Sequence, residues 1–494
     1  MVVKLKKPSF SWVWITVTSV FCALFTFALI PGAAAQANLN STPVQRQNYT
    51  NLIQNVFNFI LQNYVDDVDP QVLFEGAMNG MFGALNDPYS SYLTESDMTD
   101  MSDTTQGNFG GVGLNIIKAV SPRPDGKPMW VEVVSPIEDT PGWRAGIQPG
   151  DFITEIDGTP TESITMDDVL GILRGPPGEN VRLTIRRGDK LEFPVTITRA
   201  IIEVPTVKHA MIGDTGYLKL LTFTPMTANR AREAITEFRA NNYKSLVLDL
   251  RNNYGGLLSS AVDVANLFLD SGPIVSIRSR IIYENRSYNA TRSTLVSADI
   301  PVIVLINRGS ASASEIVAGA LKDRGRAFLV GENTFGKGSV QQVYDLNEAG
   351  FKITTARYYT PSNVNIDIIG IPPDREVLFP KYTEEDAVHL NQLINANRIP
   401  IFVEQNPRAT SAQIDVFART LEREYMLDLS LLRRLIRDEF NRTTYAPVYD
   451  LEYDVQLLEA INILRSGAYN SLMQNAKTLK ELQEEAESKL VQSL

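Results

Sequence analysis

The stretch PVIVLINRGSASASEIVAGALKDRGRAFLVG, residues 301–331, decides the fold that this sequence predicts. Its first part, PVIVLIN, is a continuous apolar run of strand length, SEIVAGALKD is patterned as a helix, and AFLVG is a second apolar run. Near-continuous apolar strands that are joined by helices indicate a largely parallel sheet. The stretch therefore predicts an α/β core.

The same alternation extends over residues 200–380. Two strand–helix pairs precede the stretch, GYLKLLTF with ANRAREAITEFRA and SLVLDL with LLSSAVDVANLFL, and the hairpin SVQQVYDL…FKITTARYY follows it. Residues 104–199 have a different pattern, in which short strands lie between glycines around one short helix, TMDDVLGIL. This change predicts a separate, small β-rich module before the core.

Both ends of the chain are predicted to be helical. In NLIQNVFNFILQNYV, near the N-terminus, the apolar residues recur at helical spacing, and a second helix leads to a turn at Asn86–Pro88. From residue 381 onward the chain is helical and polar, and the composition of residues 475–494 favours a solvated helix over a partner-binding one. The predicted segments are 1–37, a signal peptide; 38–103, an N-terminal helical region; 104–199, the β-rich module; 200–380, the α/β core; and 381–494, a C-terminal helical region.

The first residues have the pattern of a secretory signal. A lysine-containing start precedes the apolar run VFCALFTFALI at 20–30, and PGAAAQA at 31–37 offers small-residue cleavage sites after Ala35 or Ala37. An uncleaved membrane anchor is the alternative, because the apolar stretch from Trp12 to Ile30 is nearly long enough to span a bilayer. The pattern favours cleavage and a periplasmic location, with a thylakoid lumen or a membrane-anchored periplasmic form as alternatives.

Composition excludes several classes of function. The 494 residues carry a net charge of −11, which argues against nucleic-acid binding, because a phosphate backbone requires a basic surface. The only cysteine, Cys22, lies inside the predicted signal. An exported mature chain would therefore have no disulfide, no thiol nucleophile and no cysteine-based metal site.

The serine run GSASASE has the pattern of an exposed nucleophile. It leads from a buried strand through a tight turn into a helix, a geometry that resembles a nucleophile elbow. The N-terminus of the helix also presents unpaired N–H groups that suit a developing oxyanion. A purely structural reading is available as well, because Ser312-x-x-Glu315 is a well-formed capping box.

A serine hydroxyl needs a base, and the sequence offers few candidates. The only two histidines, His209 and His389, lie outside strand-end motifs, which disfavours a Ser–His–Asp triad. Lys337 in GENTFGKGSV follows the strand AFLVG, so it and the serine turn are expected at the same edge of the sheet. A lysine pKa near ~10.4 falls by up to ~3–5 units on burial, which would make the amine a usable base. The alternative is a surface lysine in a glycine turn.

A third motif, LVLDLRNNYGGLL at residues 246–258, runs from a buried strand into a glycine pair that opens a helix. Such a turn is a natural source of oxyanion-hole N–H groups, although glycine turns of this kind also end many strands.

Together, GSASASEI, TFGKGSVQ, LDLRNNYGGLL and NDPYSSYL resemble the C-terminal processing peptidases, also called tail-specific proteases, over residues from about 50 to 380. The resemblance implies a crotonase/ClpP-like α/β serine protease core with an inserted PDZ domain, flanked by helical N- and C-terminal regions. It assigns the nucleophile to Ser312, the base to Lys337, and the orientation of the amine to Gln341, with possible support from Asp323. It places the oxyanion hole at the N–H groups of Ala313 and of Gly255 or Gly256. Tyr254 departs from the proline that the family usually has before the glycine pair, which leaves this loop less tightly constrained.

The β-rich module resembles a PDZ domain. FGGVGLNI (109–116) matches its carboxylate-binding loop, so the N–H groups of Val112, Gly113 and Leu114 are expected to bind the carboxylate of a peptide that adds a strand to the sheet. Arg174 matches a candidate sensor that links peptide binding to the active site. A PDZ domain with only a structural role is the alternative.

The resemblance implies an exported serine endopeptidase that binds the C-terminal tails of proteins or peptides and cuts near that end through an acyl-enzyme. No metal or cofactor is expected; a homodimer is expected, and a regulatory adaptor is compatible with the pattern. Two other functions remain open, a catalytically silent PDZ scaffold or tail-binding chaperone, and a crotonase-type acyl-CoA enzyme. The export signal and the PDZ insert argue against the second of these.

Overall fold

The computed structural model describes residues 43–119, 128–188, 190–347, 349–379, 383–442 and 447–492. The chain divides into two compact units, one that ends at Ala84 and one that begins at Leu85. The predicted signal peptide lies outside the described residues. Among the helices of the described ranges, none is long and apolar enough to cross a membrane.

In its described part, residues 43–84, the first unit contains the helices α2 (Pro43–Asn63) and α3 (Pro70–Gly83). Asp69 caps α3 by accepting the Gln71 N–H at 2.8 Å, and proline occupies the first helical position, where no N–H is needed. No residue of α3 is buried. Apolar side chains of α2 are also more than half exposed, namely Tyr49, Leu52, Ile53 and Phe59. This pair of helices therefore presents apolar surface.

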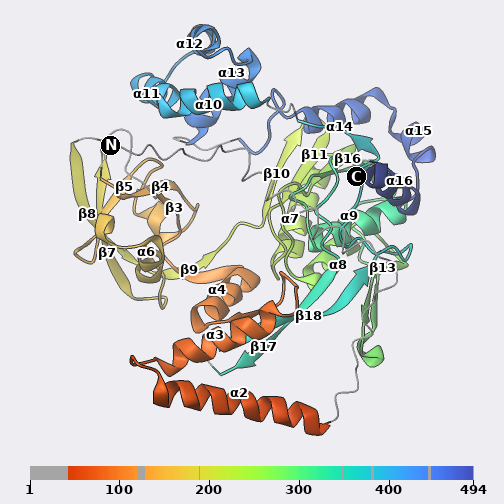
Figure 1. Ribbon diagram of the computed structural model, residues 1–494. Coiled ribbons are helices and arrows are strands. Elements are labelled where there is room, and N and C mark those ends of the chain that lie inside the picture. Colours follow the sequence, from red (N-terminus) through yellow and green to blue (C-terminus); the bar gives the residue numbers. More distant parts are fainter. Residues whose placement is uncertain are drawn as a thin grey trace, which may run out of the picture. The chain divides into compact units, whose positions relative to one another are not determined.

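The second unit is organised around a six-stranded sheet with the order β10-β11-β12-β15-β16-β19. Strands β10, β11 and β16 of this sheet are labelled in Figure 1. Strands β11, β12, β15, β16 and β19 are parallel, and only the edge strand β10 is antiparallel. The predicted α/β core with a largely parallel sheet is therefore confirmed. The bounds of the strands are β10 (Val207–Ile212), β11 (Thr215–Leu220), β12 (Ser245–Asp249), β15 (Val302–Ile306), β16 (Phe328–Gly331) and β19 (Arg375–Glu376).

Helices cover both faces of this sheet, which explains the continuous apolar runs of its strands. Leu246 and Leu248 of β12 join one apolar cluster with residues of α7 (Thr227–Ala240), α8 (Leu258–Asn266) and α9 (Ala313–Asp323). Because side chains alternate along a strand, Val247 faces the opposite way and joins a second cluster with residues of α14 (Val455–Ser466) and α15 (Tyr469–Gln474).

An antiparallel sheet lies next to the turn at residues 332–338, which carries Lys337 (the lysine turn). This sheet brings a segment from a distant part of the sequence close to that turn. The predicted hairpin forms as β17 (Ser339–Leu346) and β18 (Ala349–Tyr359). Strand β18 also pairs with β1 (Ser91–Leu93), which places the end of the NDPYSSYL motif beside the hairpin. The remaining strands of this sheet are β13 (Pro273–Ser279) and β14 (Arg286–Asn289).

The β-rich module has its own sheet and core. Its sheet has the order β3-β4-β5-β7-β8, and β6 (Thr159–Pro160) pairs with β5. Its buried cluster includes Val169 and Leu173 of α6. The module follows α4 (Glu95–Gln106) and is bounded by the pair β2 (Asn108–Gly111) and β9 (Ala200–Glu203); its other elements are β3 (Leu114–Lys118), β4 (Val131–Pro136), α5 (Pro141–Arg144), β5 (Phe152–Ile156), α6 (Met166–Leu173), β7 (Asn180–Arg187) and β8 (Leu191–Thr198).

The C-terminal region is helical, as predicted. Four helices share an apolar cluster of their own: α10 (Glu384–Asn395), α11 (Arg398–Gln405), α12 (Ser411–Tyr425) and α13 (Leu429–Arg442). The expectation of a solvated final helix is wrong for α16 (Leu479–Gln492), because Leu479 is fully buried in the cluster that contains α9. Gln483 is also buried and donates to the Gly370 carbonyl at 2.7 Å.

A buried ion network joins the C-terminal region to the end of β12. The Arg251 guanidinium donates to both carboxylate oxygens of Asp249 and to both of Asp454, the residue that caps α14. Burial alone would raise the pKa of Asp249, but the adjoining Arg251 charge lowers it to about 2. Tyr217 also donates to Asp249, at 2.7 Å. The network therefore fixes Arg251, the first residue of the loop that carries Gly255 and Gly256 (the glycine loop).

We expect Asp454→Asn to lower the free energy of unfolding by about 2 kcal/mol, because it removes one charge from a buried pair whose complete disruption costs ~3–5 kcal/mol. Arg251 keeps Asp249 as a partner, and asparagine can still cap α14. Urea unfolding measures the effect, with the exposed Asp263→Asn as the matched control. Equal stability of the two variants would show that the network contributes nothing measurable.

Candidate active site

The turn between β15 and α9 holds Ser312 in an unusual backbone conformation. Ser312 has φ 55° and ψ −113°, a region that costs a residue other than glycine about 1–3 kcal/mol. The two neighbouring serines are fully buried, and their hydroxyls donate at 2.8 Å to main-chain carbonyls, Ser310 to Leu250 and Ser314 to Asn253. Both hydroxyls are thus engaged as donors, which leaves Ser312 as the candidate nucleophile of the motif. These two bonds tie both sides of the strained turn to residues 250–253, at the start of the glycine loop.

The glycine loop lies directly against this turn. A Cβ on Gly255 would lie 2.8 Å from the Ser312 Cβ and 3.0 Å from the Ala313 nitrogen, so only glycine fits there. In the described part of the chain, no group accepts the Ala313 N–H, which is at the start of α9. This donor and the glycine loop thus border the space beside Ser312.

The two glycines differ as oxyanion donors. The Gly255 N–H donates to the Asn253 side-chain oxygen at 2.9 Å. The Gly255 carbonyl accepts the Phe223 N–H at 3.0 Å, so the Gly256 N–H of the same trans peptide points the opposite way. Of the pair, Gly256 is therefore the donor that remains available in this conformation. Tyr254 is 80% exposed on the same loop.

Glu315 joins the serine turn to the lysine turn. Its carboxylate is fully buried and accepts four hydrogen bonds. Oε2 accepts the backbone N–H of Ser312 at 2.8 Å and that of Lys337 at 2.9 Å, while Oε1 accepts the Gly336 N–H at 2.8 Å and the Thr334 hydroxyl at 2.6 Å. Burial raises the pKa of Glu315, and these hydrogen bonds oppose the rise. One oxygen atom thus holds the backbones of both predicted catalytic residues.

The Lys337 side chain is half-buried, and its ammonium lies over the ring of Tyr89, 4.7 Å from the ring centroid. Burial lowers the pKa of Lys337, the nearby Lys352 lowers it further, and Asp87 and Glu315 oppose the shift. Among the residues that the structure describes, Lys337 Nζ forms no hydrogen bond with Ser312 Oγ. The structure brings the two backbones together and leaves the amine on Tyr89.

Tyr358 is a residue that the sequence did not single out. It is buried, its hydroxyl donates to the Lys337 carbonyl, and it faces the Ser312 side chain. Burial raises its pKa well above the usual value, so the hydroxyl stays protonated. Tyr358 lies on β18, and the alternating pattern of that strand did not indicate that this residue would contact the site.

In the described part of the chain, Gln341 and Asp323 form hydrogen bonds with neither Ser312 nor Lys337. The amide of Gln341 donates to the hydroxyls of Ser339 and Thr354, at 2.9 and 3.1 Å, rather than to the lysine. Asp323 ends α9, roughly 15 Å along the helix axis from the turn, and accepts the Ser362 N–H at 2.9 Å. In this conformation Gln341 braces the hairpin, and Asp323 anchors the far end of the nucleophile helix.

The histidines lie elsewhere. His209 is on the edge strand β10 and its Nε2 lies 2.9 Å from the Glu237 carboxylate, while His389 belongs to α10 in the C-terminal helical region. Neither contacts Ser312 within the described ranges, which agrees with the sequence argument against a triad.

The predicted carboxylate-binding loop has its N–H groups turned toward one side. The carbonyls of Val112 and Gly113 accept the N–H groups of Gly142 and Ile137, at 2.7 and 2.9 Å. Because a trans peptide directs its C=O and N–H oppositely, the N–H groups of Gly113 and Leu114 point away from residues 137–142. This arrangement suits an anion on the other side of the loop.

Arg174 connects the β-rich module to α4. Its guanidinium forms ion pairs with Asp100 and Asp103 and lies 5.2 Å from the centroid of the Phe109 ring. These partners of Arg174 are not among the residues 112–114 that are expected to bind the peptide carboxylate.

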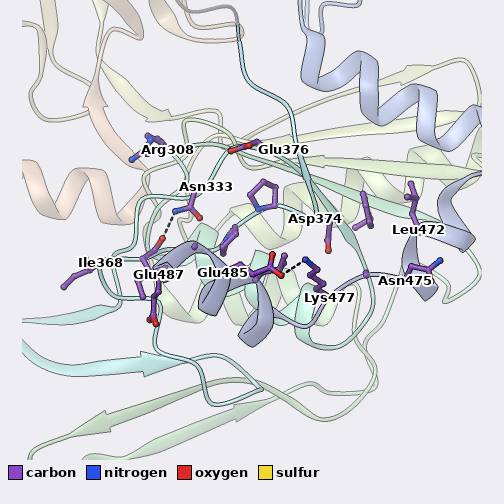
Figure 2. A pocket seen from close by; sticks show the side chains of 17 residues that line it. Arg308, Asn333, Ile368, Asp374, Glu376, Leu472, Asn475, Lys477, Glu485 and Glu487 are labelled. Atoms are coloured by element: carbon purple, nitrogen blue, oxygen red, sulfur yellow. Dashed lines mark hydrogen bonds and ion pairs between the residues drawn. The ribbon is translucent and has the colours of Figure 1, made fainter. Parts of the chain in front are cut away.

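Two cavities lie near the lysine turn. One, of about 580 Å³, is lined by Asn86, Asp87, Pro88, Tyr89, Phe335, Gly336, Ser339, Thr354, Arg357, Asp367 and Ile368. The other, of about 690 Å³, is lined in part by residues of α16 and by neither Ser312 nor Lys337. Figure 2 shows Asn333, Asp374 and Glu485 among the side chains that line it. There the Asn333 amide donates to the Ile369 carbonyl at 2.6 Å, and both residues line this second cavity. The first cavity adjoins the predicted centre.

Comparison with known proteins gives three family matches. Residues 214–377 match peptidase family S41, residues 132–187 match the PDZ domain, and residues 28–97 match the N-terminal domain of the activating protease CtpB. These matches fall on the α/β core, the β-rich module and the N-terminal segment, respectively.

Named relatives are similar over much of the chain. A carboxy-terminal-processing protease of Bartonella bacilliformis is 43% identical over 325 residues, 65% of this chain and 73% of the relative. The chloroplastic carboxyl-terminal-processing peptidase 2 of Arabidopsis thaliana is 39% identical over 324 residues, 62% of this chain and 61% of that one. Among solved structures, a photosystem II D1 C-terminal processing protease is 32% identical with a TM-score of 0.40, over 67% of this chain and 88% of that one.

Proposed function

The chain belongs to peptidase family S41 and is a C-terminal processing serine protease with a PDZ domain, and from that premise we propose that it cuts exported proteins near their C-termini with a Ser312–Lys337 dyad. The observation that carries the proposal is the shared carboxylate oxygen of Glu315, which holds the backbone N–H groups of both residues. Two residues 25 positions apart are thereby fixed next to each other at the edge of the sheet.

The chemistry follows from the groups around Ser312. The neutral Lys337 amine takes the hydroxyl proton while Oγ forms a bond to the scissile carbonyl carbon, and the carbonyl electron pair moves onto its oxygen. The N–H groups of Ala313 and Gly256 stabilise this oxyanion. When the C–N bond breaks, the Lys337 ammonium returns the proton to the leaving amine. A water molecule then hydrolyses the acyl-enzyme by the same proton route.

The lowered pKa of Lys337 supports this role, because only the neutral amine can accept a proton. Activity should therefore rise with pH through the pKa of Lys337 and reach a plateau above it.

Tail recognition is assigned to the PDZ domain. The N–H groups of Gly113 and Leu114 would bind the terminal carboxylate, and the peptide would add a strand beside β3. The basic, apolar start of the sequence supports export to a periplasm. The exposed apolar side chains of α2 support a homodimer that uses the N-terminal helices, because monomers rarely leave such surface open. The proposal also includes a regulatory adaptor, a partner protein that would control the protease.

A substrate with an amidated C-terminus should test tail recognition. We expect kcat/KM for a loosely folded protein with an apolar tail to fall about tenfold or more on amidation, since a hydrogen bond to a charged group contributes about 1.5–3 kcal/mol. Fragments are quantified by mass spectrometry, and the Ser312→Ala variant is the inactive control, in which tail binding is measured directly. Equal kcat/KM for the acid and the amide would rule out recognition of the carboxylate.

A further inference from the structure

The turn of the NDPYSSYL motif has a contact that the proposed chemistry does not use. The Lys337 ammonium lies 4.7 Å from the centroid of the Tyr89 ring, although the two residues come from distant parts of the sequence. An ammonium over an aromatic face is attracted by the ring quadrupole, and the attraction grows where water is excluded. Lys337 and Tyr89 are both partly buried, so this contact is partly shielded from bulk water.

Tyr89 is held in place by a rigid turn. The Asp87 carboxylate accepts the Tyr89 N–H at 3.0 Å and the Ser90 hydroxyl at 2.6 Å. The Ser90 hydroxyl in turn accepts the Thr354 N–H of β18 at 2.9 Å, and β1 continues the turn as a strand paired with β18. The ring is therefore built onto the same sheet as the hairpin that follows the lysine.

We propose that Tyr89 is a positioning residue that holds the charged form of Lys337 over its ring and releases the neutral amine toward Ser312. The inference rests on the proposed role of Lys337 as the base. A neutral amine has no net charge for the ring to attract, so the cation–π interaction is lost when the proton leaves. The position of the side chain thereby follows its protonation state, and the amine reaches Ser312 in the form that can act.

Other charged groups act on the same amine. Lys352 faces it from β18, Asp87 from the turn and Glu315 from α9, while Asp367 faces the Tyr89 ring. None of these groups is changed by substituting Tyr89, so a series at this position isolates the contribution of the ring. Tyr89 also lines the cavity of about 580 Å³ next to the lysine turn, so the ring can be exchanged for side chains of other sizes without displacing the core.

The test measures the pKa of Lys337 without relying on catalysis. Acylation of the Lys337 amine by acetic anhydride is followed against pH by mass spectrometry in a Ser312→Ala background, with Tyr89→Leu, Tyr89→Phe and Tyr89→Trp added. We expect Leu to lower this pKa by about 0.5–1 unit, Phe to leave it unchanged and Trp to raise it. The same pKa for tyrosine and leucine would overturn the inference. If the leucine variant does not fold, a pKa in the tryptophan variant that is no higher than with tyrosine would overturn the inference instead.

Kinetics separate this role from a purely structural one. In enzymes with Ser312 intact, the acid limb of the plot of kcat/KM against pH should move to lower pH by the same ~0.5–1 unit in Tyr89→Leu. The plateau value of kcat/KM should change by no more than about twofold. A lowered plateau with an unshifted limb would mean that Tyr89 only supports the fold, and it would overturn the inference. Near-normal activity of a Lys337→Arg variant would instead contradict the proposed function, whatever the labelling of Lys337 shows.

Discussion

Lys337→Arg is expected to lose about 10⁴-fold in kcat while it keeps its fold and its affinity for a peptide tail. Arginine retains the positive charge and can still lie over the Tyr89 ring, but it stays protonated at any working pH and cannot accept the Ser312 proton. Loss of a positioned general base together with the proton donor for the leaving amine accounts for a decrease of this size. Hydrolysis is followed by mass spectrometry of the fragments over a range of pH.

The control is Lys244→Ala, which removes an exposed lysine directly before β12. It should leave kcat unchanged. Ser312→Ala should be as inactive as Lys337→Arg, and the double variant no worse than either, because residues that act as a unit are not additive. A Lys337→Arg enzyme with near-normal turnover would rule out the dyad and leave His209 and His389 as the candidates for the base.

Glu315→Gln is expected to lower kcat by at least about 10²-fold although Glu315 takes no proton in the reaction. Each carboxylate oxygen accepts two donors, one pair of which is the backbone N–H groups of Ser312 and Lys337. An amide can offer only one oxygen, so its NH₂ group must face two donors, and each buried donor left without an acceptor costs about 1–3 kcal/mol. The serine and lysine turns should then separate.

The exposed Glu404→Gln on α11 is the matched control and should have no effect. Binding of a C-terminal tail, measured by calorimetry, should survive in Glu315→Gln, because the PDZ domain has its own core. Wild-type kcat in this variant would show that the shared carboxylate does not set the geometry of the site.

The core of the fold could be predicted because its strands are buried on both faces. Every residue of β12 and of β15 is buried, which leaves continuous apolar runs that no surface strand would carry. The burial of α16 could not be predicted in the same way. Its sequence is polar, and the burial of Gln483 depends on one distant acceptor, the Gly370 carbonyl.

The site was predictable as a set of motifs and only partly as a geometry. The motif alone did not choose among three alternating serines, and the bonds of Ser310 and Ser314 to the Leu250 and Asn253 carbonyls favour Ser312. Glu315 was visible as a helix cap, but its bonds to Gly336 and Lys337 depend on how two turns meet. Such contacts join residues far apart in sequence, and no local pattern encodes them.

The most direct test of the dyad is the rate at which a fluorophosphonate modifies Ser312, measured against pH. In this reaction Oγ forms a bond to phosphorus and fluoride leaves, so the rate reports how readily the hydroxyl is activated, without any need for a peptide substrate. The Ser312–Lys337 dyad predicts a single adduct on Ser312 whose rate of formation rises with pH to a plateau, no adduct in Ser312→Ala, and modification at least 100-fold slower in Lys337→Arg. An adduct on another residue, or an unchanged rate in Lys337→Arg, would contradict it.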